Sequence, residues 1–362
     1  MAGKRIMQVV YSLGVGGSEM VARDIALGLK GLGWANAVCA LERGGALQPE
    51  LEQAGVETFV SGRKAGVLGT MFKLFRAIRR FRPDVVHTHH LYELFYAWPG
   101  ALLCGAGIVH TEHEYFSLEN GKARFFIRLL SRLCKRVTAV NRETASYIEC
   151  LLGWPKDRVA TIVNGIDLQA FGGARPDRAS LGLTEQDRVV GIVARLEPVK
   201  GHDVLLTAFS RVLDTFPDAA LLVVGEGSRR QELEQMADSL GISRRVHFLG
   251  IRRDVPQLLA AMDVMALSSL EEGLPVSILE AMGAGLPVVA SAVGGIPAVV
   301  RDMETGMLVP AGNVQALADA LERVLGDAVL AHAMGQAGFK LVSGTYGANA
   351  MVQSYREIYD TI

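Results

Sequence analysis

Two successive series of short apolar segments alternate with helical patterns along this 362-residue chain, and no other feature limits its fold as strongly. The apolar segments are continuous runs and lack the strict polar alternation of a half-exposed sheet. Strands have this character when crossover helices cover both faces of a parallel sheet. The pattern therefore predicts an α/β protein with two doubly wound domains that face a central cleft.

The join between the domains is expected at Gly172 and Gly173, where both periodicities stop. The first domain then covers 1–172 and the second 173–343, while 344–362 has the pattern of one last amphipathic helix. The segments expected as strands are 5–13, 36–41, 84–90, 107–113, 136–141 and 159–165 in the first domain, and 189–196, 219–227, 246–250, 264–269 and 287–291 in the second.

Charge is distributed unevenly although the formal net charge is only −1. Residues 1–172 contain 21 Lys and Arg against 15 Asp and Glu, whereas the remainder contains 16 against 23. A basic first domain favours an anionic surface as partner, and the overall balance argues against a nucleic-acid-binding protein. The four cysteines are far apart in sequence, which fits neither a zinc site nor a disulfide framework and suits a reducing compartment.

Two segments of the first domain, 72–82 and 122–136, combine basic residues with aromatic ones. Basic amphipathic helices of this kind can lie in the headgroup region of an anionic membrane, although a solvated helix face is the plainer alternative. The apolar start of the chain is interpreted as a first strand rather than a signal peptide, and no stretch is long and unbroken enough to span a bilayer. The expected location is the cytoplasm, with or without peripheral contact to the inner face of the cell membrane.

A glycine-rich turn, SLGVGGSE, follows the first expected strand. Gly14, Gly16 and Gly17 stand where the strand turns into a helix, so their backbone N–H groups can bind a phosphate or another anion. A dinucleotide-binding fingerprint needs a third glycine at position 19, which is Glu19 here. The turn therefore does not support a nicotinamide dehydrogenase, and tight packing is its alternative explanation.

The second domain opens with VVGIVARLEPVKG, in which Arg195 ends a strand and Lys200 follows before a helix. Ligands of open α/β sheets bind at the carboxyl ends of the strands, where these two cations are expected. Arginine offers a planar fork and lysine a point charge, a combination that suits a diphosphate.

The segment SSLEEGLPVSILEAMGAGLPVVAS, residues 268–291, places acids in an otherwise apolar region. Gly273 and Pro275 mark the start of a helix, with Glu272 just outside it and Glu280 inside it. Both carboxylates can then accept hydrogen bonds from the hydroxyl groups of one elongated ligand, whereas Glu271 is interpreted as a solvated neighbour. The N–H groups expected to be free at the start of this helix belong to Leu274, Val276 and Ser277.

The motifs GVGGSE, IVNGIDLQAF, VARLEPVKG, VVGEGSRRQELE, VHFLG, the 268–291 segment and VGGIPAVVRDMETGMLVPAGN resemble those of the retaining glycosyltransferases of family 4, which have the GT-B fold. The resemblance spans nearly the whole chain and preserves the motif order. It implies two Rossmann-like domains, of which 1–172 is on the acceptor side and 173–343 binds the nucleotide sugar, with 344–362 crossing back to the first. One departure is Ala194, where the family usually has glycine before the arginine.

The resemblance also implies roles for individual residues. Arg195 and Lys200 would bind the diphosphate and offset the charge that develops on the leaving group. Glu280 would hold the ribose, Glu272 the donor sugar, and His113 would orient hydroxyl groups or polarise the site. The implied catalytic residues are His113, Arg195, Lys200 and Glu272, and the implied substrate-binding residues are Gly16, Gly17, His89, Gly273, Leu274, Pro275, Val276, Ser277 and Glu280.

Five histidines stand near the ends of two expected strands, at positions 87, 89, 90, 110 and 113. No acid completes a familiar metal-ligand spacing with them, and the family uses Arg and Lys where other enzymes use a metal, so no metal is expected. His89 is expected as an acceptor contact and His87 as a core residue.

The expected function is retaining transfer of a hexose from a nucleoside-diphosphate sugar to a hydroxyl of a saccharide or lipid-linked acceptor, in cell-envelope polysaccharide or glycolipid synthesis. A UDP-sugar is expected as donor ahead of a GDP-sugar, with no cofactor. The alternatives are a sugar-nucleotide epimerase or phosphorylase of the same fold, and a non-catalytic protein that binds a nucleotide sugar.

Overall fold

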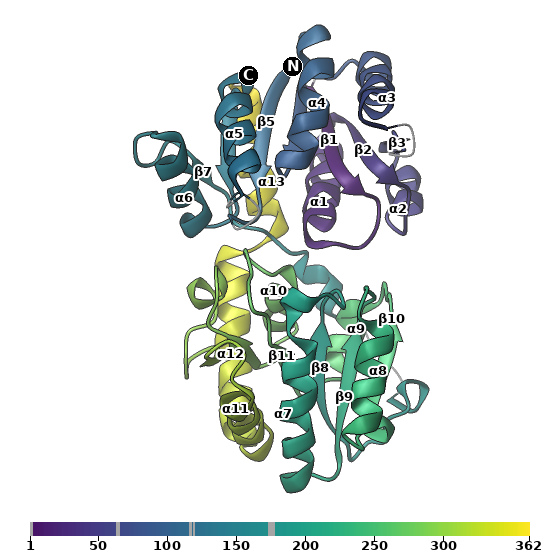
Figure 1. The fold of residues 1–362 in the computed structure, drawn as a ribbon, viewed down its shortest axis with the longest axis vertical. Helices are drawn as coiled ribbons and strands as arrows, with labels where there is room; N and C mark the ends of the chain where they lie inside the picture. Colours follow the sequence, from purple (N-terminus) through teal and green to yellow (C-terminus); the bar gives the residue numbers. More distant parts are fainter. Residues whose placement is uncertain (1–2, 63–65, 116–117, 119, 173–177) are drawn as a thin grey trace. The chain divides into compact units, whose positions relative to one another are not determined.

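The computed structural model describes residues 3–62, 66–115, 118, 120–172 and 178–362 (Figure 1). The chain divides into two compact units: the first is Met1–Gly165 together with Ala348–Ile362, and the second is Ile166–Gly347. The chain thus leaves the first unit a few residues before the expected join and re-enters it a few residues after the expected end of the second domain. Residues 173–177, next to that expected join, lie outside the described part.

The first unit contains a parallel sheet with the strand order β3-β2-β1-β4-β5-β6-β7. Because the order reverses between β1 and β4, the carboxyl ends of these two strands form the topological switch point where open α/β sheets bind ligands. The strands are β1 (Arg5–Ser12), β2 (Ala35–Arg43), β3 (Glu57–Val60), β4 (Val85–His89), β5 (Gly107–Glu112), β6 (Arg136–Ala139) and β7 (Ala160–Thr161).

Helices cover both faces of this sheet, as the buried residues of β2 show. Ala37 and Cys39 pack in a cluster with residues of α3 and α4, whereas Val38 and Ala40 pack with residues of α1. This is the alternation that a strand imposes on successive side chains. The helices of the first unit are α1 (Gly17–Gly31), α2 (Gln48–Gln53), α3 (Gly66–Phe81), α4 (Leu91–Leu103), α5 (Gly121–Leu130), α6 (Arg142–Leu152) and α13 (Ala348–Asp360).

The basic segment 122–136 is not one helix, contrary to the sequence-based expectation. Helix α5 ends at Leu130, and a 3₁₀ turn at Ser131–Leu133 follows. The N–H of Lys135 then donates to the carbonyl of Ile108, 2.8 Å away, because the chain has already joined the sheet as the approach to β6. The segment 72–82, in contrast, is helical to Phe81 as part of α3.

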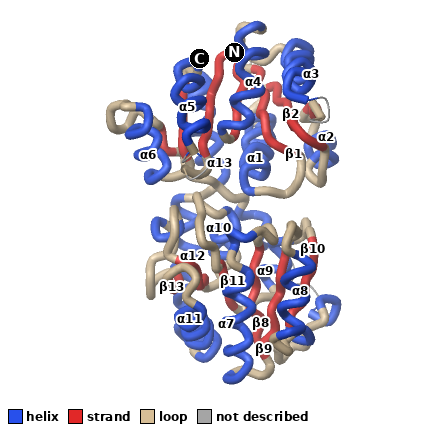
Figure 2. Tube along the Cα trace, viewed as in Figure 1, coloured by secondary structure: helices blue, strands red, loops and turns tan. Residues whose placement is uncertain are grey.

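The second unit contains a parallel sheet with the order β10-β9-β8-β11-β12-β13, and Figure 2 shows the strands of each unit as a layer between helices. Within the described ranges, no helix has both the length and the hydropathy that crossing a bilayer requires. The strands are β8 (Arg188–Val193), β9 (Ala219–Val224), β10 (Val246–Gly250), β11 (Val264–Leu267), β12 (Val288–Ser291) and β13 (Gly306–Val309), and the helices are α7 (His202–Thr215), α8 (Arg230–Ser239), α9 (Val255–Ala260), α10 (Val276–Gly283), α11 (Val314–Gly326) and α12 (Ala328–Thr345).

Candidate functional site

The second unit brings a lysine and a glutamate from separate loops into direct contact. The Nζ of Lys200 lies 2.6 Å from Oε1 of Glu272, and the hydroxyl of Ser269 donates to the same oxygen at 2.6 Å. Glu272 is buried and Lys200 is largely so. Within the described part of the chain no hydrogen bond to Oε2 of Glu272 is found, so this oxygen can accept one from a ligand.

Hydrogen bonds to backbone carbonyls hold these two loops side by side at the carboxyl edge of the sheet. The N–H of Leu270 donates to the carbonyl of Val199 at 2.8 Å, and the hydroxyl of Ser268 donates to the carbonyl of Gly201 at 2.8 Å. Gly201 has a φ of +61°, and a Cβ there would lie 2.2 Å from the carbonyl oxygen of Ser268. Only glycine permits this close approach, which explains the Lys-Gly pair in the sequence.

Helix α10 begins at Val276, with Pro275 as its extended N-cap residue. The first-turn N–H groups of Val276 and Ser277 have no acceptor inside the helix and none elsewhere among the described residues, so they are available at its positive end. Glu280 lies on this helix and is half-buried, whereas Glu271 is exposed. The helix start predicted from Gly273 and Pro275 is therefore confirmed.

A second glycine turn, which the sequence interpretation did not single out, closes over the backbone of Glu272. The N–H of Gly295 donates to the carbonyl of Gly273 at 2.7 Å. At Gly294 the φ is +52°, and a Cβ would lie 1.7 Å from the carbonyl oxygen of Glu272. These glycines belong to the VGGIP motif, which is visible in the sequence. Their contact with the backbone of Glu272 and Gly273 could not be predicted from it.

Arg195 was expected to end a strand, but β8 ends at Val193, so Arg195 lies in the loop that follows and its side chain is exposed. Among the described residues it forms no ion pair, unlike Lys200. Its guanidinium is therefore free to move toward an anion at this edge of the sheet.

In the first unit, the glycine-rich turn leads directly into α1, whose first residue is Gly17 and whose N-cap residue is Gly16. The carboxylate of Glu19 folds back over this turn, because Ser12 Oγ donates to its Oε1 at 3.3 Å and Ser18 Oγ to its Oε2 at 3.0 Å. A Cβ at Gly16 would lie 2.3 Å from Oε2 of Glu19. Glu19 thus occupies the position that the third glycine of a dinucleotide fingerprint would leave empty.

His113 lies just beyond β5 and is 8% exposed. Its Nε2 is 3.0 Å from Nδ1 of His89, and the Nε2 of His89 is 2.9 Å from Oε1 of Gln8. His89 has no exposed surface and both of its ring nitrogens have protein partners. The direct acceptor contact expected for His89 is thus not possible in this structure, because the side chain is packed behind His113. Burial, then the charges of neighbouring histidines, lowers the pKa of His113 well below 6.5.

Glu112 connects two further histidines at the same edge and was not anticipated. His90 Nδ1 lies 3.2 Å from its Oε1, and His110 Nε2 lies 3.3 Å from its Oε2. Burial opposes protonation of His90, but the hydrogen bond and charge of Glu112 outweigh it and raise its pKa to about 9. His90 also has a φ of +76°, which is uncommon for a residue other than glycine. The sequence signal for this cluster was the segment HTEH, in which Glu112 stands between His110 and His113.

Glu93 is a further buried acid near this cluster, in the first turn of α4. Its Oε2 has no hydrogen-bond partner among the described residues, and burial raises its pKa to about 8. Throughout the described residues, no three His, Cys, Asp or Glu side chains are grouped as a metal site requires.

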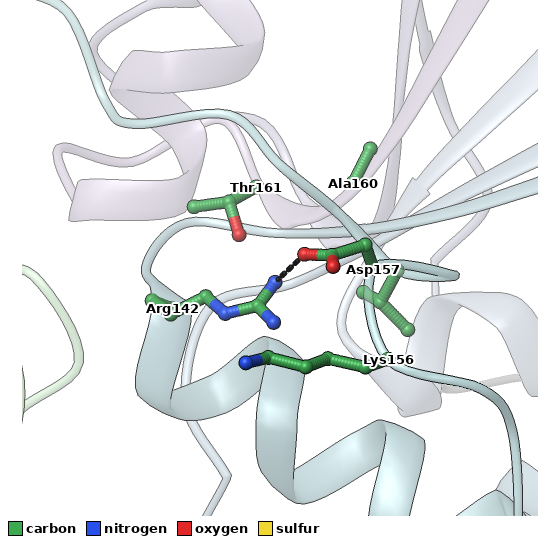
Figure 3. Close-up of a pocket in the computed structure, with 6 residues that line it drawn as sticks. Arg142, Lys156, Asp157, Ala160 and Thr161 are labelled. Atoms are coloured by element: carbon green, nitrogen blue, oxygen red, sulfur yellow. Dashed lines mark ion pairs between the residues drawn. The ribbon is translucent and has the colours of Figure 1, made fainter.

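A surface pocket of about 520 Å³ in the first unit contains none of the predicted site residues (Figure 3). It is lined by Arg142 at the start of α6, by Lys156 and Asp157 from the following loop, and by Thr161 of β7. Arg142 forms an ion pair with Asp157 at 2.9 Å, drawn as a dashed line in Figure 3. The charge of Arg142 is therefore already paired within the protein, and the site residues predicted from the sequence lie outside this pocket.

Family models match both halves of the chain. Residues 15–170 match the model described as Glycosyltransferase Family 4, and residues 174–341 match the model Glycosyl transferases group 1. The chain belongs to glycosyltransferase family 4. The family predicted from the motifs is thereby confirmed.

Curated relatives of this family 4 chain share about a third of its residues over two thirds of its length. The D-inositol 3-phosphate glycosyltransferase of Corynebacterium urealyticum is 32% identical over 269 residues, which are 67% of this chain and 63% of that protein. The enzyme of the same name from Mycobacterium tuberculosis is 32% identical over 262 residues, 67% of this chain and 54% of that protein. The alignment thus spans less than two thirds of these relatives.

Solved structures confirm the GT-B fold of this family 4 chain. HepE of Anabaena, in complex with UDP and glucose, superposes with a TM-score of 0.88 at 24% identity, covering 99% of this chain and 100% of that one. WaaG, a glycosyltransferase involved in lipopolysaccharide biosynthesis, superposes with a TM-score of 0.78 at 18% identity, covering 98% and 99%. At such identities the likeness concerns the fold alone.

Proposed function

We propose that this chain transfers a hexose from a nucleoside-diphosphate sugar to an acceptor hydroxyl, with retention at the anomeric carbon and without a metal ion. The observation that carries the proposal is the contact between Lys200 and Glu272 at the carboxyl edge of the second sheet, beside the start of α10. It combines a cation for phosphate, a carboxylate oxygen for sugar hydroxyls and helix N–H groups for an anion.

The second unit would bind the donor through three kinds of group. Lys200 and the free Arg195 would hold the diphosphate and stabilise its charge as the glycosidic bond breaks. Glu272 would accept from the sugar through Oε2, because Ser269 and Lys200 already engage its Oε1. Glu280 would hold the ribose, and the backbone from Gly273 to Ser277 would line the sugar. The complex of HepE with UDP and glucose supports a UDP-sugar as the donor.

The first unit would provide the acceptor side, with His113 and the Gly16–Gly17 turn near the transferred sugar. A saccharide or lipid-linked acceptor fits the basic character of this unit and a role in cell-envelope glycolipid or polysaccharide synthesis. The relatives named for D-inositol 3-phosphate favour a polyol or sugar hydroxyl as the acceptor group.

Peripheral contact with an anionic membrane is part of the same proposal. Exposed apolar residues stand on three helices that pack in sequence, α3 against α4 and α4 against α5. Phe72 is 59% exposed on α3, Leu103 77% on α4 and Phe125 62% on α5. Phe72 and Phe125 have basic residues next to them in the sequence, Lys73 and Arg124, a combination that matches an anionic lipid surface. We place the enzyme in the cytoplasm at the inner face of the membrane.

The proposal is tested by incubating the protein with UDP-hexoses, with and without sugar, polyol and lipid-extract acceptors, in the presence of EDTA. Product that forms only with an acceptor, and whose NMR coupling shows the anomeric configuration of the donor, supports a retaining, metal-independent transferase. Turnover of the donor sugar to its epimer would favour the epimerase, and consumption of donor that requires inorganic phosphate would favour the phosphorylase. A concentration-dependent rise in melting temperature with UDP but no turnover would favour the binding protein.

A further inference from the structure

The face of the first sheet that α13 covers carries a group of buried polar side chains among apolar ones. The polar side chains, all without exposed surface, are those of Gln8, His87, His89, Thr111 and Thr138. Buried polar groups destabilise a fold unless they are hydrogen-bonded. Helix α13 provides two partners for them, Tyr355 and Tyr359.

An unbroken series of hydrogen bonds runs from α13 to His113. Gln8 Nε2 donates to the hydroxyl of Tyr359 at 3.3 Å, and Gln8 Oε1 lies 2.9 Å from His89 Nε2. His89 Nδ1 in turn lies 3.0 Å from His113 Nε2. Three contacts thus connect the last helix of the chain with the histidine that the family assigns to the site.

The chemistry of Gln8 determines which atoms along this series carry protons. An amide oxygen only accepts, so His89 Nε2 must be the donor toward Gln8. Burial lowers the pKa of His89 well below 6.5, so its ring is neutral near pH 7 and carries a single N–H. His89 Nδ1 is then an acceptor, and His113 Nε2 must donate to it. The remaining lone pair of the neutral His113 ring is at Nδ1.

Tyr359 orients the amide of Gln8 because its hydroxyl proton is committed elsewhere. The hydroxyl lies 2.6 Å from His87 Nδ1, and His87 Nε2 lies 2.7 Å from the hydroxyl of Thr111. When Tyr359 donates to His87, its oxygen can only accept from Gln8, which turns the amide nitrogen toward α13 and the amide oxygen toward His89. This arrangement gives each hydrogen bond along both branches one donor and one acceptor.

We propose that Gln8 and His89 are positioning residues through which Tyr359 of α13 fixes His113 in the tautomer with a proton on Nε2 and a free lone pair on Nδ1. The use of that lone pair to accept a hydrogen bond from a sugar hydroxyl rests on the proposed function. His89 therefore acts through His113 and not on the acceptor itself.

A second set of polar contacts on the other face of the sheet is separate from this series. Thr88 Oγ1 lies 3.0 Å from His110 Nδ1, and His110 continues through Glu112 to His90. The His90 ring lies 4.8 Å from the His113 ring between centroids. A charged His90 at this distance disfavours protonation of His113 and so helps to keep it neutral.

The test is long-range ¹H–¹⁵N NMR of histidine-labelled protein without any substrate, with His113 assigned from the His113→Gln variant. We expect a protonated Nε2 and an unprotonated Nδ1 on His113 in the parent protein. In Tyr359→Phe the amide of Gln8 loses its constraint. The ¹⁵N chemical shifts of both His113 ring nitrogens should then move toward the average of the two tautomers. Gln8→Met, which keeps the volume but removes the acceptor, should do the same.

The matched control is Tyr355→Phe, which removes a buried hydroxyl from the same helix, where it bonds Thr111 and not Gln8. It should leave the His113 shifts unchanged. With donor and acceptor, Tyr359→Phe should lower kcat about tenfold, the effect of one lost hydrogen bond, with little change in KM, and Tyr355→Phe should not.

A protonated Nδ1 on His113 in the parent protein, or equal shifts in the two tyrosine variants, would overturn the proposal. Because the NMR experiment needs no turnover, the expected tautomer in a protein that transfers no sugar would refute the proposed function while leaving the hydrogen-bond series intact.

Discussion

The ammonium group of Lys200 lies 2.6 Å from Oε1 of Glu272, 72 residues later in the chain, and the hydroxyl of Ser269 bonds the same oxygen. The pair joins a cation after the first strand of the second sheet with an acid before α10. Because both groups are largely removed from water, this contact and the Ser269 hydroxyl fix the Glu272 carboxylate, and a ligand that replaces the Lys200 contact would reorient both side chains.

Lys200→Met should lower kcat for transfer about 10²–10³-fold, since it removes a positive charge where the leaving diphosphate gains negative charge. Glu272→Gln should lower kcat similarly, because it removes the negative charge beside Lys200 and replaces Oε2, the acceptor proposed for a sugar hydroxyl, with an amide N–H donor. Steady-state kinetics with a UDP-hexose measure the effect, and circular dichroism verifies the fold.

The matched control for this pair is Glu271→Gln, because Glu271 is the exposed neighbour of Glu272. It should retain the parent activity within a factor of about two, as surface changes away from a site usually do. Equal losses in Glu271→Gln and Glu272→Gln, or parent-like kcat in Lys200→Met, would contradict the site assignment.

Gly294→Ala should disable the loop that carries Glu272. A Cβ at this position would meet the carbonyl oxygen of Glu272 at 1.7 Å, in addition to the strain of a φ of +52°. Displacing the Glu272 backbone by even 1 Å should reduce activity roughly 10²-fold. Gly312→Ala separates clash from strain, because Gly312 has a φ of +71° with nothing within 4 Å of the added carbon.

Gly312→Ala should therefore lose about 1–2 kcal/mol in a urea-unfolding experiment, the cost of the left-handed conformation alone, and keep its activity. If Gly294→Ala unfolds at the same urea concentration as Gly312→Ala and is equally active, the glycine turn does not position Glu272.

The sequence predicted the central strands of both sheets and the edge strands β7 and β10, but it missed the other two edge strands, β3 and β13. The central strands are continuous apolar runs such as 219–224, whose type is evident without knowledge of the fold. The segment Glu57–Val60 is half-exposed, and its four residues have no period to recognise. It becomes a strand because it pairs with β2, which is a tertiary fact.

The same distinction separates the site residues that were predicted from those that were missed. Glu272 and Lys200 stand beside glycines and a proline that mark local turns, so their place at a sheet edge follows from the sequence. Gln8 and Tyr359 are 351 positions apart and meet only because α13 packs on the first sheet. No local pattern in either segment indicates that contact.

Acid should destabilise the second unit through His202. This residue is buried beside Lys200, neither ring nitrogen has a partner among the described residues, and burial, then the charges of Arg229 and Lys200, lowers its pKa from 6.5 to about 4. The unfolded chain binds a proton near pH 6.5 but the folded chain does not. The stability is therefore present above pH 6.5 and is lost as the pH falls toward 4, by about 3 kcal/mol at most.

His202→Leu should flatten this dependence, because leucine binds no proton in either state. Urea unfolding monitored by far-ultraviolet circular dichroism between pH 4.5 and 7.5 gives the slope of the unfolding free energy with pH, whereas Trp34, Trp98 and Trp154 all lie in the first unit and their fluorescence would not report this transition. His332→Leu, at an exposed position of α12, is the control and should keep the parent slope. Identical slopes for the two variants would show that His202 does not carry the acid sensitivity.

Membrane contact should depend on both the aromatic and the basic residues of α3 and α5. Phe72→Ser with Phe125→Ser should reduce co-sedimentation with phosphatidylglycerol-containing vesicles, because it removes two exposed rings that can enter the headgroup region. Raising the salt concentration should weaken binding of the parent protein, as screening shortens the reach of the basic side chains. Phe339→Ser alters an exposed phenylalanine of the second unit and should bind like the parent. Binding that is equal on phosphatidylcholine vesicles, or that is lost equally in Phe339→Ser, would mean that these helices are merely solvated.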